Sequence, residues 1–293
     1  MLGVGLASIG PATLLEGLRG LTYTRPPAAS APSASPHPDA ALQARLNGVA
    51  ASLATGSLSA SIVDLRSGAT ASLDADRAYP AASLFKLPIL ATVLAEESAG
   101  LLDDDQLLEV RPEDWTDGSG VLQARVGDRL PVHELVRLMI QESDNIAALV
   151  LLDQVGVGRV NATADQLGLV STHLVDHRGG ESGDHTTSAH DMASLLRTIA
   201  AGQLVDARTS ERALQLLELK QANAWLAEDL PFWVKLAHKW GDLPDARNDA
   251  GIVFSPRGNV VVAVLTRDGE PDEVEHLIAR TARTAYDFLG TSS

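Results

Sequence analysis

The chain reads Ala82-Ser83-Leu84-Phe85-Lys86-Leu87-Pro88 where an apolar stretch with helical spacing begins. In a helix, a lysine three residues after a serine lies one turn further along on the same face. A serine hydroxyl is a poor nucleophile until a base takes its proton, and a lysine amine can serve once burial lowers its pKa. The stretch therefore predicts a helix over 84–98 that begins with a serine nucleophile and its base. The alternative is an ordinary helix N-terminus, with Ser83 as cap and Lys86 in solvent.

The composition of the chain excludes some classes of function and of site. Of the 293 residues, 23 are Lys or Arg and 38 are Asp or Glu, so the net charge is −15 and binding to nucleic acid is not expected. The chain has no cysteine, which excludes disulfides and thiolate metal sites. Lysine is scarce, and its positions are Lys86, Lys220, Lys235 and Lys239. Because arginine cannot lose a proton as lysine can, some of these positions mark chemistry.

Two further segments carry candidate functional residues. Ser143-Asp144-Asn145 is interpreted as an N-cap, or as a proton carrier at Ser143 with the Asn145 amide holding substrate. His238-Lys239-Trp240-Gly241 is interpreted as a strand end with a surface lysine, or as a strand edge where Gly241 admits substrate beside the Lys239 charge. Arg247 follows and either holds a substrate carboxylate or pairs with Asp249 or another acid.

Periodicity along the rest of the chain predicts an α/β fold of mixed α+β type. Helices are expected at 39–54, 84–98, 133–141, 145–154, 188–200 and 271–289, and strands at 59–65, 70–74, 233–238, 250–254 and 260–266. Strands at both ends of a helical middle indicate a sheet lobe with a helical lobe inserted at about 84–220, and the site is expected between the lobes.

The N-terminal 38 residues are expected to lie outside the catalytic domain, which spans 39–293. Residues 2–15 are apolar but too short for a membrane span, and no basic residue precedes them. They are interpreted as a truncated export signal or anchor, or as a disordered tail. Residues 25–38 are rich in Pro, Ala and Ser and predict a tether. An exported protein, periplasmic or extracellular and without stable membrane insertion, is the expectation.

The order Ser-x-x-Lys, Ser-Asp-Asn and Lys-x-Gly resembles the signature of class A β-lactamases and penicillin-binding proteins. The likeness extends to 82–88, 117–123, 138–140, 186–195 and 238–253, and it covers about 40–290. It implies a β-lactamase/transpeptidase-like fold, in which helices flank an antiparallel sheet lobe and an all-helical lobe is inserted.

This resemblance implies a serine hydrolase that forms an acyl-enzyme on Ser83 without cofactor or metal. Lys86 is then the base or proton relay, and Ser143 passes the proton to the leaving nitrogen. Lys239 tunes Ser143 and helps to bind a substrate carboxylate. The oxyanion hole is formed by the backbone N–H groups of Ser83 and Asp242.

Three substrate activities follow from the resemblance. The first is hydrolysis of a β-lactam amide, an activity that implies roles in β-lactam catabolism and antibiotic resistance. The alternatives are a D-alanyl-D-alanine carboxypeptidase or esterase of the same fold, and a penicillin-binding module that does not turn over. The expected partner is a small molecule, and the protein is expected to be a monomer.

The sequence departs from the family at two places. The loop that carries a Glu-x-x-Leu-Asn base in class A enzymes is several residues short, and Glu181 is its only glutamate. Glu181 is therefore either the base that releases the acyl group or a surface acid. Trp240 stands where the family has Thr or Ser, so it either alters substrate recognition or turns aside to stack on substrate.

A cluster of histidines raises a separate possibility. His173, His177, His185 and His190 fall within 18 residues, with Asp176 and Asp184 among them. Such a group can bind zinc, but the spacing matches no standard ligand set, and the resemblance explains the segment as a loop. No metal site is predicted.

Overall fold

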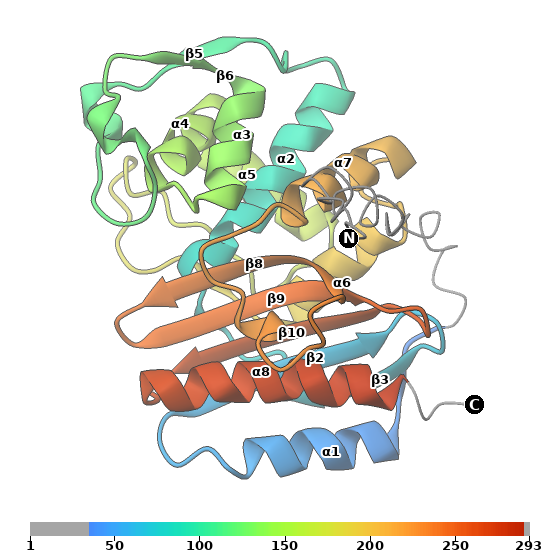
Figure 1. Ribbon diagram of the computed structural model, residues 1–293. Helices are drawn as coiled ribbons and strands as arrows, with labels where there is room; N and C mark the ends of the chain where they lie inside the picture. The colour runs from blue at the N-terminus through green and yellow to red at the C-terminus, as the bar shows by residue number, and fades with distance from the viewer. Residues whose placement is uncertain (1–34, 290–293) are drawn as a thin grey trace, which may run out of the picture.

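The computed structural model describes residues 35–289 (Figure 1). Most of the N-terminal segment for which a signal and tether are predicted lies outside this range. Residues at its very end form strand β1 (His37–Pro38), which pairs in parallel with β3 (Ala69–Leu73). The tether prediction is therefore wrong for these last two residues, because a backbone that reaches the sheet edge satisfies its N–H and C=O groups there.

One six-stranded sheet forms the base of the molecule, in the order β1-β3-β2-β10-β9-β8. Besides β1 and β3, its strands are β2 (Ser57–Asp64), β8 (Lys235–Leu243), β9 (Ala246–Phe254) and β10 (Val260–Arg267). All pairs except β1–β3 are antiparallel. Strand β8 is an edge strand, so one side of its backbone is open to another chain or a ligand. It extends five residues beyond the predicted strand end at 238 and includes Lys239, Trp240 and Gly241.

Helices cover the two faces of the sheet unequally (Figure 1). Helices α1 (Ala40–Ala50) and α8 (Pro271–Phe288) lie on one face. Asp39 caps α1 by accepting the Leu42 N–H at 2.8 Å, as the sequence predicts, although the helix ends four residues before the predicted end. The other helices lie on the opposite side of the sheet (Figure 1). They are α2 (Lys86–Ser98), α3 (Val132–Gln141), α4 (Asn145–Val155), α5 (Val157–Gln166), α6 (Ala189–Ala200) and α7 (Ala207–Leu217).

Short elements complete the fold. They are the 3₁₀ helices η1 (Ala82–Phe85), η2 (Pro112–Asp114), η3 (Leu122–Ala124) and η4 (Trp225–Ala227), the pair β4 (Tyr79–Pro80) with β7 (Thr186–Thr187), and the pair β5 (Leu107–Glu109) with β6 (Arg129–Pro131). The β5–β6 ribbon adds strand structure to a lobe predicted to consist of helices only.

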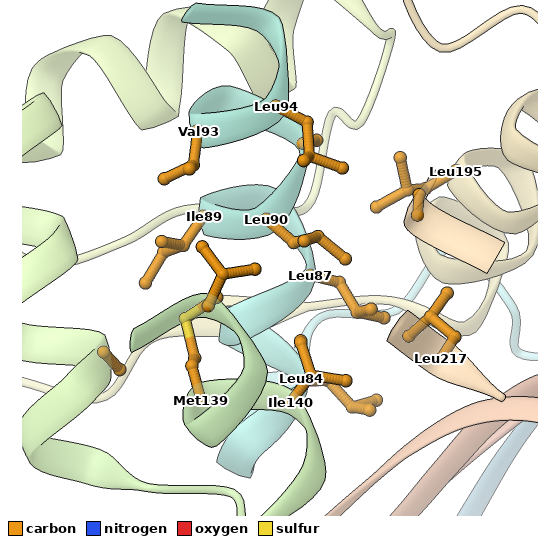
Figure 2. Packing of buried hydrophobic residues seen from close by; sticks show 14 of the residues in the cluster. Leu84, Leu87, Ile89, Leu90, Val93, Leu94, Met139, Ile140, Leu195 and Leu217 are labelled. Atoms are coloured by element: carbon orange, nitrogen blue, oxygen red, sulfur yellow. The ribbon is translucent and has the colours of Figure 1, made fainter. Parts of the chain in front are cut away.

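The larger apolar core surrounds α2, the helix that begins at Lys86 (Figure 2). Met139 and Ile140 of α3, Leu195 of α6 and Leu217 of α7 approach it, and all are at most 1% exposed. Burial at this level stabilises by roughly 1.5–3 kcal/mol per large apolar side chain. The helix that presents Lys86 is therefore held rigidly.

Within residues 35–289, no single helix is long and apolar enough to cross a bilayer. Helices α4 and α5 meet that criterion only as a pair, and they are bent by 84° at their junction.

Candidate functional site

The turn η1 brings Ser83 and Lys86 into direct contact. Lys86 Nζ lies 3.0 Å from Ser83 Oγ. Ala81, not Ser83, is the N-cap of η1, and Lys86 is fully buried. The interpretation as an ordinary capped helix start with a solvated lysine is therefore wrong. Ala82, just before the serine, has φ = +45°, a left-handed conformation that costs energy and persists only where packing imposes it.

Lys86 also joins the two serine segments. Its Nζ donates to Ser143 Oγ at 3.1 Å, to the Ser143 carbonyl at 2.5 Å and to Asn145 Oδ1 at 2.7 Å. Burial, and then the nearby charge of Lys239, hold the pKa of Lys86 well below its usual value, while Asp144 opposes them. A lysine amine in these surroundings can lose its proton and accept one from a hydroxyl.

Asp144 builds the segment from which Ser143 and Asn145 project, and it is the N-cap of α4, as the capping interpretation of this segment predicts. Its buried carboxylate caps α4 through the Ala147 N–H at 2.9 Å. It also accepts the N–H groups of Val121 and Leu122, at 2.6 and 3.0 Å. The second half of this role is invisible in sequence because the partners lie more than 20 residues away. Ser143 itself has φ = +51°, so the segment is held in a strained conformation.

Gly241 on β8 packs directly against the nucleophile. A Cβ atom at this position would lie 2.7 Å from the Ser83 backbone nitrogen and 2.9 Å from the Ala82 Cβ. Only glycine permits so close an approach. The edge of β8 next to Asp242 therefore lies beside the Ser83 N–H, which is the arrangement that the predicted oxyanion hole requires.

Lys239 is fully buried on the site face of β8. Its Nζ donates to the Trp240 carbonyl at 2.8 Å and lies 4.9 Å from the centre of the Trp240 ring. Burial lowers the pKa of Lys239 to about 7, against the opposing charge of Asp249. The alternative of a surface lysine is wrong.

The Trp240 side chain points into the core on the far face of the sheet. It is 6% exposed and meets Trp225 edge to face, with ring centres 5.9 Å apart. Of the two predictions for this residue, stacking on substrate is therefore wrong, because the ring is buried. The consequence that remains is the absence of a hydroxyl at this position.

Arg247 is engaged by acids of the protein. Its guanidinium forms ion pairs with Asp242 and, at 3.2 Å, with Glu275 of α8, and it donates to the Leu243 carbonyl at 2.6 Å. The alternative of pairing with an acid is thus correct, with Asp242 and Glu275 in place of Asp249. Asp249 instead pairs with His238 Nδ1 at 2.8 Å.

Glu181 does not join the cluster around Ser83. Its side chain is exposed, and Oε2 accepts the Asp176 N–H of the same loop at 2.8 Å. Asp176 in turn accepts the Gly179 N–H at 2.8 Å. These carboxylates close the loop on itself, which favours the surface-acid interpretation of Glu181.

Two contacts that sequence reasoning missed fasten this loop to the protein. Arg178 pairs with Asp114 of η2 at 2.5 Å and with Asp153 of α4 at 2.8 Å. Asp114 is fully buried, and hydrogen bonds from Arg111 and Arg178 outweigh its burial and lower its pKa. At the end of the loop, His185 packs on Phe85 with ring centres 4.5 Å apart. Because the chain has more acidic than basic residues, the sequence alone does not indicate which acid pairs with Arg178.

The histidines do not converge on a metal. Among the described residues no group of three or more His, Asp or Glu side chains has a metal-binding arrangement. His185 Nδ1 accepts the Val175 N–H at 2.9 Å, and burial lowers its pKa to about 4. His190 pairs with Asp76 at 2.5 Å at the surface.

Comparison with known proteins gives one family match and several similar structures. Residues 41–289 match a family model described as the beta-lactamase enzyme family. A point mutant of PBP-A, in an acyl-enzyme complex with penicillin G, is 26% identical with a TM-score of 0.82, covering 88% of this chain and 100% of that one. A β-lactamase from Sphaerobacter thermophilus is 28% identical with a TM-score of 0.78, covering 86% and 98%. An ancestral class A β-lactamase is 25% identical with a TM-score of 0.77, covering 84% and 99%.

Proposed function

The chain belongs to the beta-lactamase enzyme family, and we propose that it is a serine acyl-transfer enzyme. In this proposal β-lactams acylate Ser83, and the acyl group is then released slowly. The fold is β-lactamase/transpeptidase-like, as the sequence predicts. The single observation that carries the proposal is the position of the buried Lys86 amine, within hydrogen-bond distance of both Ser83 Oγ and Ser143 Oγ.

Acylation follows from these contacts. Ser83 Oγ gives its proton to neutral Lys86 and forms a bond to the substrate carbonyl carbon, whose oxygen takes the charge. The N–H groups of Ser83 and Asp242 stabilise that oxyanion, a contribution of about 3–4 kcal/mol for one such donor. Ser143 then passes a proton from Lys86 to the leaving nitrogen as the C–N bond breaks. Asn145 holds Lys86 and can contact the substrate amide.

Release of the acyl group needs a water activated by a base. The loop that would supply one turns the Glu181 carboxylate toward its own backbone, which supports slow release over rapid hydrolysis. The acyl-enzyme reported for the PBP-A mutant with penicillin G supports a β-lactam as a ligand of this chain.

Intact-protein mass spectrometry after mixing with benzylpenicillin tests the proposal. We expect an adduct with the mass of one penicillin that persists for many minutes, is absent in Ser83→Ala and maps to Ser83 after digestion. An adduct on another residue, or its formation in Ser83→Ala, rejects Ser83 as nucleophile. Nitrocefin turnover in the same samples measures release, and rapid turnover would favour the hydrolytic alternative.

A further inference from the structure

A cavity of about 260 Å³ lies between α6 and the strands β2 and β3, with Pro36 at its border. It lies on the face of the sheet on which α6 packs, toward the opposite end of the strand order from β8. Strands β10 and β9 separate β2 from β8, so the cavity is distinct from the site around Ser83. The proposed acyl transfer makes no use of the polar side chains that line it.

The strands place hydroxyl groups along this cavity. In the β2–β3 register Ser61 lies directly opposite Ser72, and Thr70 lies two residues before Ser72, so the three side chains share one face of the sheet. Ser61 is 6% exposed, and its hydroxyl makes no hydrogen bond to any residue that the structure describes. Ser59, on the same face, instead donates to the Asp74 carbonyl at 3.0 Å. Because buried hydroxyls normally have a hydrogen-bond partner, the Ser61 hydroxyl is suited to a ligand in the cavity.

Helix α6 adds an arginine that has no acidic partner. Arg197 is partly buried and lines the cavity one turn after Ser194. Among residues 35–289 its guanidinium forms no ion pair and no hydrogen bond. The other partly buried arginines in this range all form ion pairs with carboxylates, namely Arg111, Arg125, Arg137, Arg212 and Arg247. Because the chain has 38 acidic and 23 basic residues, an arginine without an acid is suited to an anion from outside the protein.

The charges around the cavity also favour an anion. Asp76 is the only acid among the described residues that line it. Its side chain is 81% exposed and pairs with His190 Nδ1 at 2.5 Å, and it forms no ion pair with Arg197. The remaining polar groups, a guanidinium and hydroxyls, can all donate hydrogen bonds. The cavity volume corresponds to roughly nine water molecules of about 30 Å³ each, so it admits a small molecule rather than a polymer.

We propose that this cavity binds a small molecule through a carboxylate or phosphate group. The Arg197 guanidinium pairs with two oxygens of that group, and the hydroxyls of Ser61 and Ser194 donate to it. Binding breaks no ion pair of Arg197, because it has none among the described residues. The net charge of −15 repels any anion at long range, so the expected affinity is modest, with a Kd of about 1 mM.

Isothermal titration calorimetry of the full chain tests the proposal, with inorganic phosphate, succinate and uncharged succinamide as probes at constant ionic strength. We expect saturable binding of phosphate or of succinate, and none of succinamide. Binding of phosphate alone identifies a phosphate group as the ligand, and binding of succinate alone identifies a carboxylate. Arg197→Gln should weaken binding by about tenfold or more, because it removes both the charge and the paired contact.

Arg208→Gln is the matched control, since it removes an equal charge from an exposed position at the start of α7 and should leave Kd unchanged. Ser61→Ala gives a second test should Arg197→Gln fail to fold. It should weaken binding several-fold and leave the Tm of the free protein unchanged, because the lost hydroxyl has no partner among the described residues. Absence of saturable binding up to about 20 mM, or equal weakening by Arg197→Gln and Arg208→Gln, would overturn the proposal. Failure of benzylpenicillin to acylate Ser83 would instead reject the proposed function and leave this result intact.

Discussion

The Ser83 cluster and the loop at 173–185 lie side by side but are built in opposite ways. In the first, a buried amine joins two hydroxyls and an amide, and strained backbone at Ala82 and Ser143 is held in place by surrounding structure. In the second, the carboxylates are partly or fully exposed, and those of Asp176 and Glu181 accept hydrogen bonds from backbone N–H groups of the same loop. The groups for acylation are therefore preorganised, whereas no carboxylate of the described loop is positioned by a contact with them.

The largest effect is expected from removing the base. In Lys86→Ala, the rate of Ser83 acylation by benzylpenicillin should fall by about 10³-fold, because general-base catalysis contributes 10²–10⁴-fold. Lys220→Ala, which removes an exposed lysine, is the control and should acylate normally. Stopped-flow or quenched mass spectrometry gives the rates. Near-normal acylation of Lys86→Ala would show that the buried amine is not the base.

Gly241→Ala breaks the contact between β8 and the nucleophile. Its Cβ would lie 2.7 Å from the Ser83 nitrogen, so either the strand or η1 must shift. We expect acylation to slow by about 100-fold, since a displacement near 1 Å has that effect. Gly158→Ala in α5 meets no atom within 4 Å and serves as control. Equal rates in the two variants would contradict the close approach of β8.

Asp114→Asn tests how firmly the loop is fastened. The change weakens charge-assisted hydrogen bonds from Arg111 and Arg178, which are 41% and 37% exposed and keep Asp153 as a partner, so we expect a loss of about 1.5–3 kcal/mol of unfolding free energy. Asp128→Asn breaks only an exposed pair with Arg125 and should cost under about 1 kcal/mol. Urea unfolding measures both, and similar values for the two would argue against a fastened loop.

The buried lysines predict a distinctive pH dependence of stability. Folded Lys239 has a pKa of about 7, whereas an unfolded lysine titrates near about 10.4. Between pH 7 and 9 the unfolded chain therefore keeps a proton that the folded chain has released, so the unfolding free energy rises with pH. We expect a rise of order 2 kcal/mol from this group, and a smaller slope in Lys239→Met. A slope unchanged in that variant would contradict the depressed pKa.

The smallest effect is expected from Glu181→Gln. Because Glu181 contacts its own loop, release of the penicilloyl group should proceed at the wild-type rate. The decay of the adduct by mass spectrometry measures this rate. A marked slowing would identify Glu181 as a base and remove the contrast between cluster and loop.

Local patterns predicted six of the eight α-helices among the described residues and the five longest strands of the sheet, because helical spacing and alternation depend on neighbouring residues. Helices α5 and α7 and the strands of two or three residues were not predicted. The pairing of Ser83, Lys86 and Ser143 also followed from motif order. What the sequence did not show depends on distant partners. Asp144 holds Val121 and Leu122, and Arg178 reaches Asp114 across 64 residues. The direction of Trp240 was left open because both sheet faces at β8 are buried, which erases the usual alternation.

The central claim is that acylation at Ser83 is fast relative to release. The most direct measurement is a time course of the benzylpenicillin adduct by intact mass spectrometry, with excess penicillin removed once labelling is complete. The account predicts that one adduct per chain forms fully and then decays over many minutes or longer. Full return to the unmodified mass within seconds would contradict it, because the loop would then supply an efficient base.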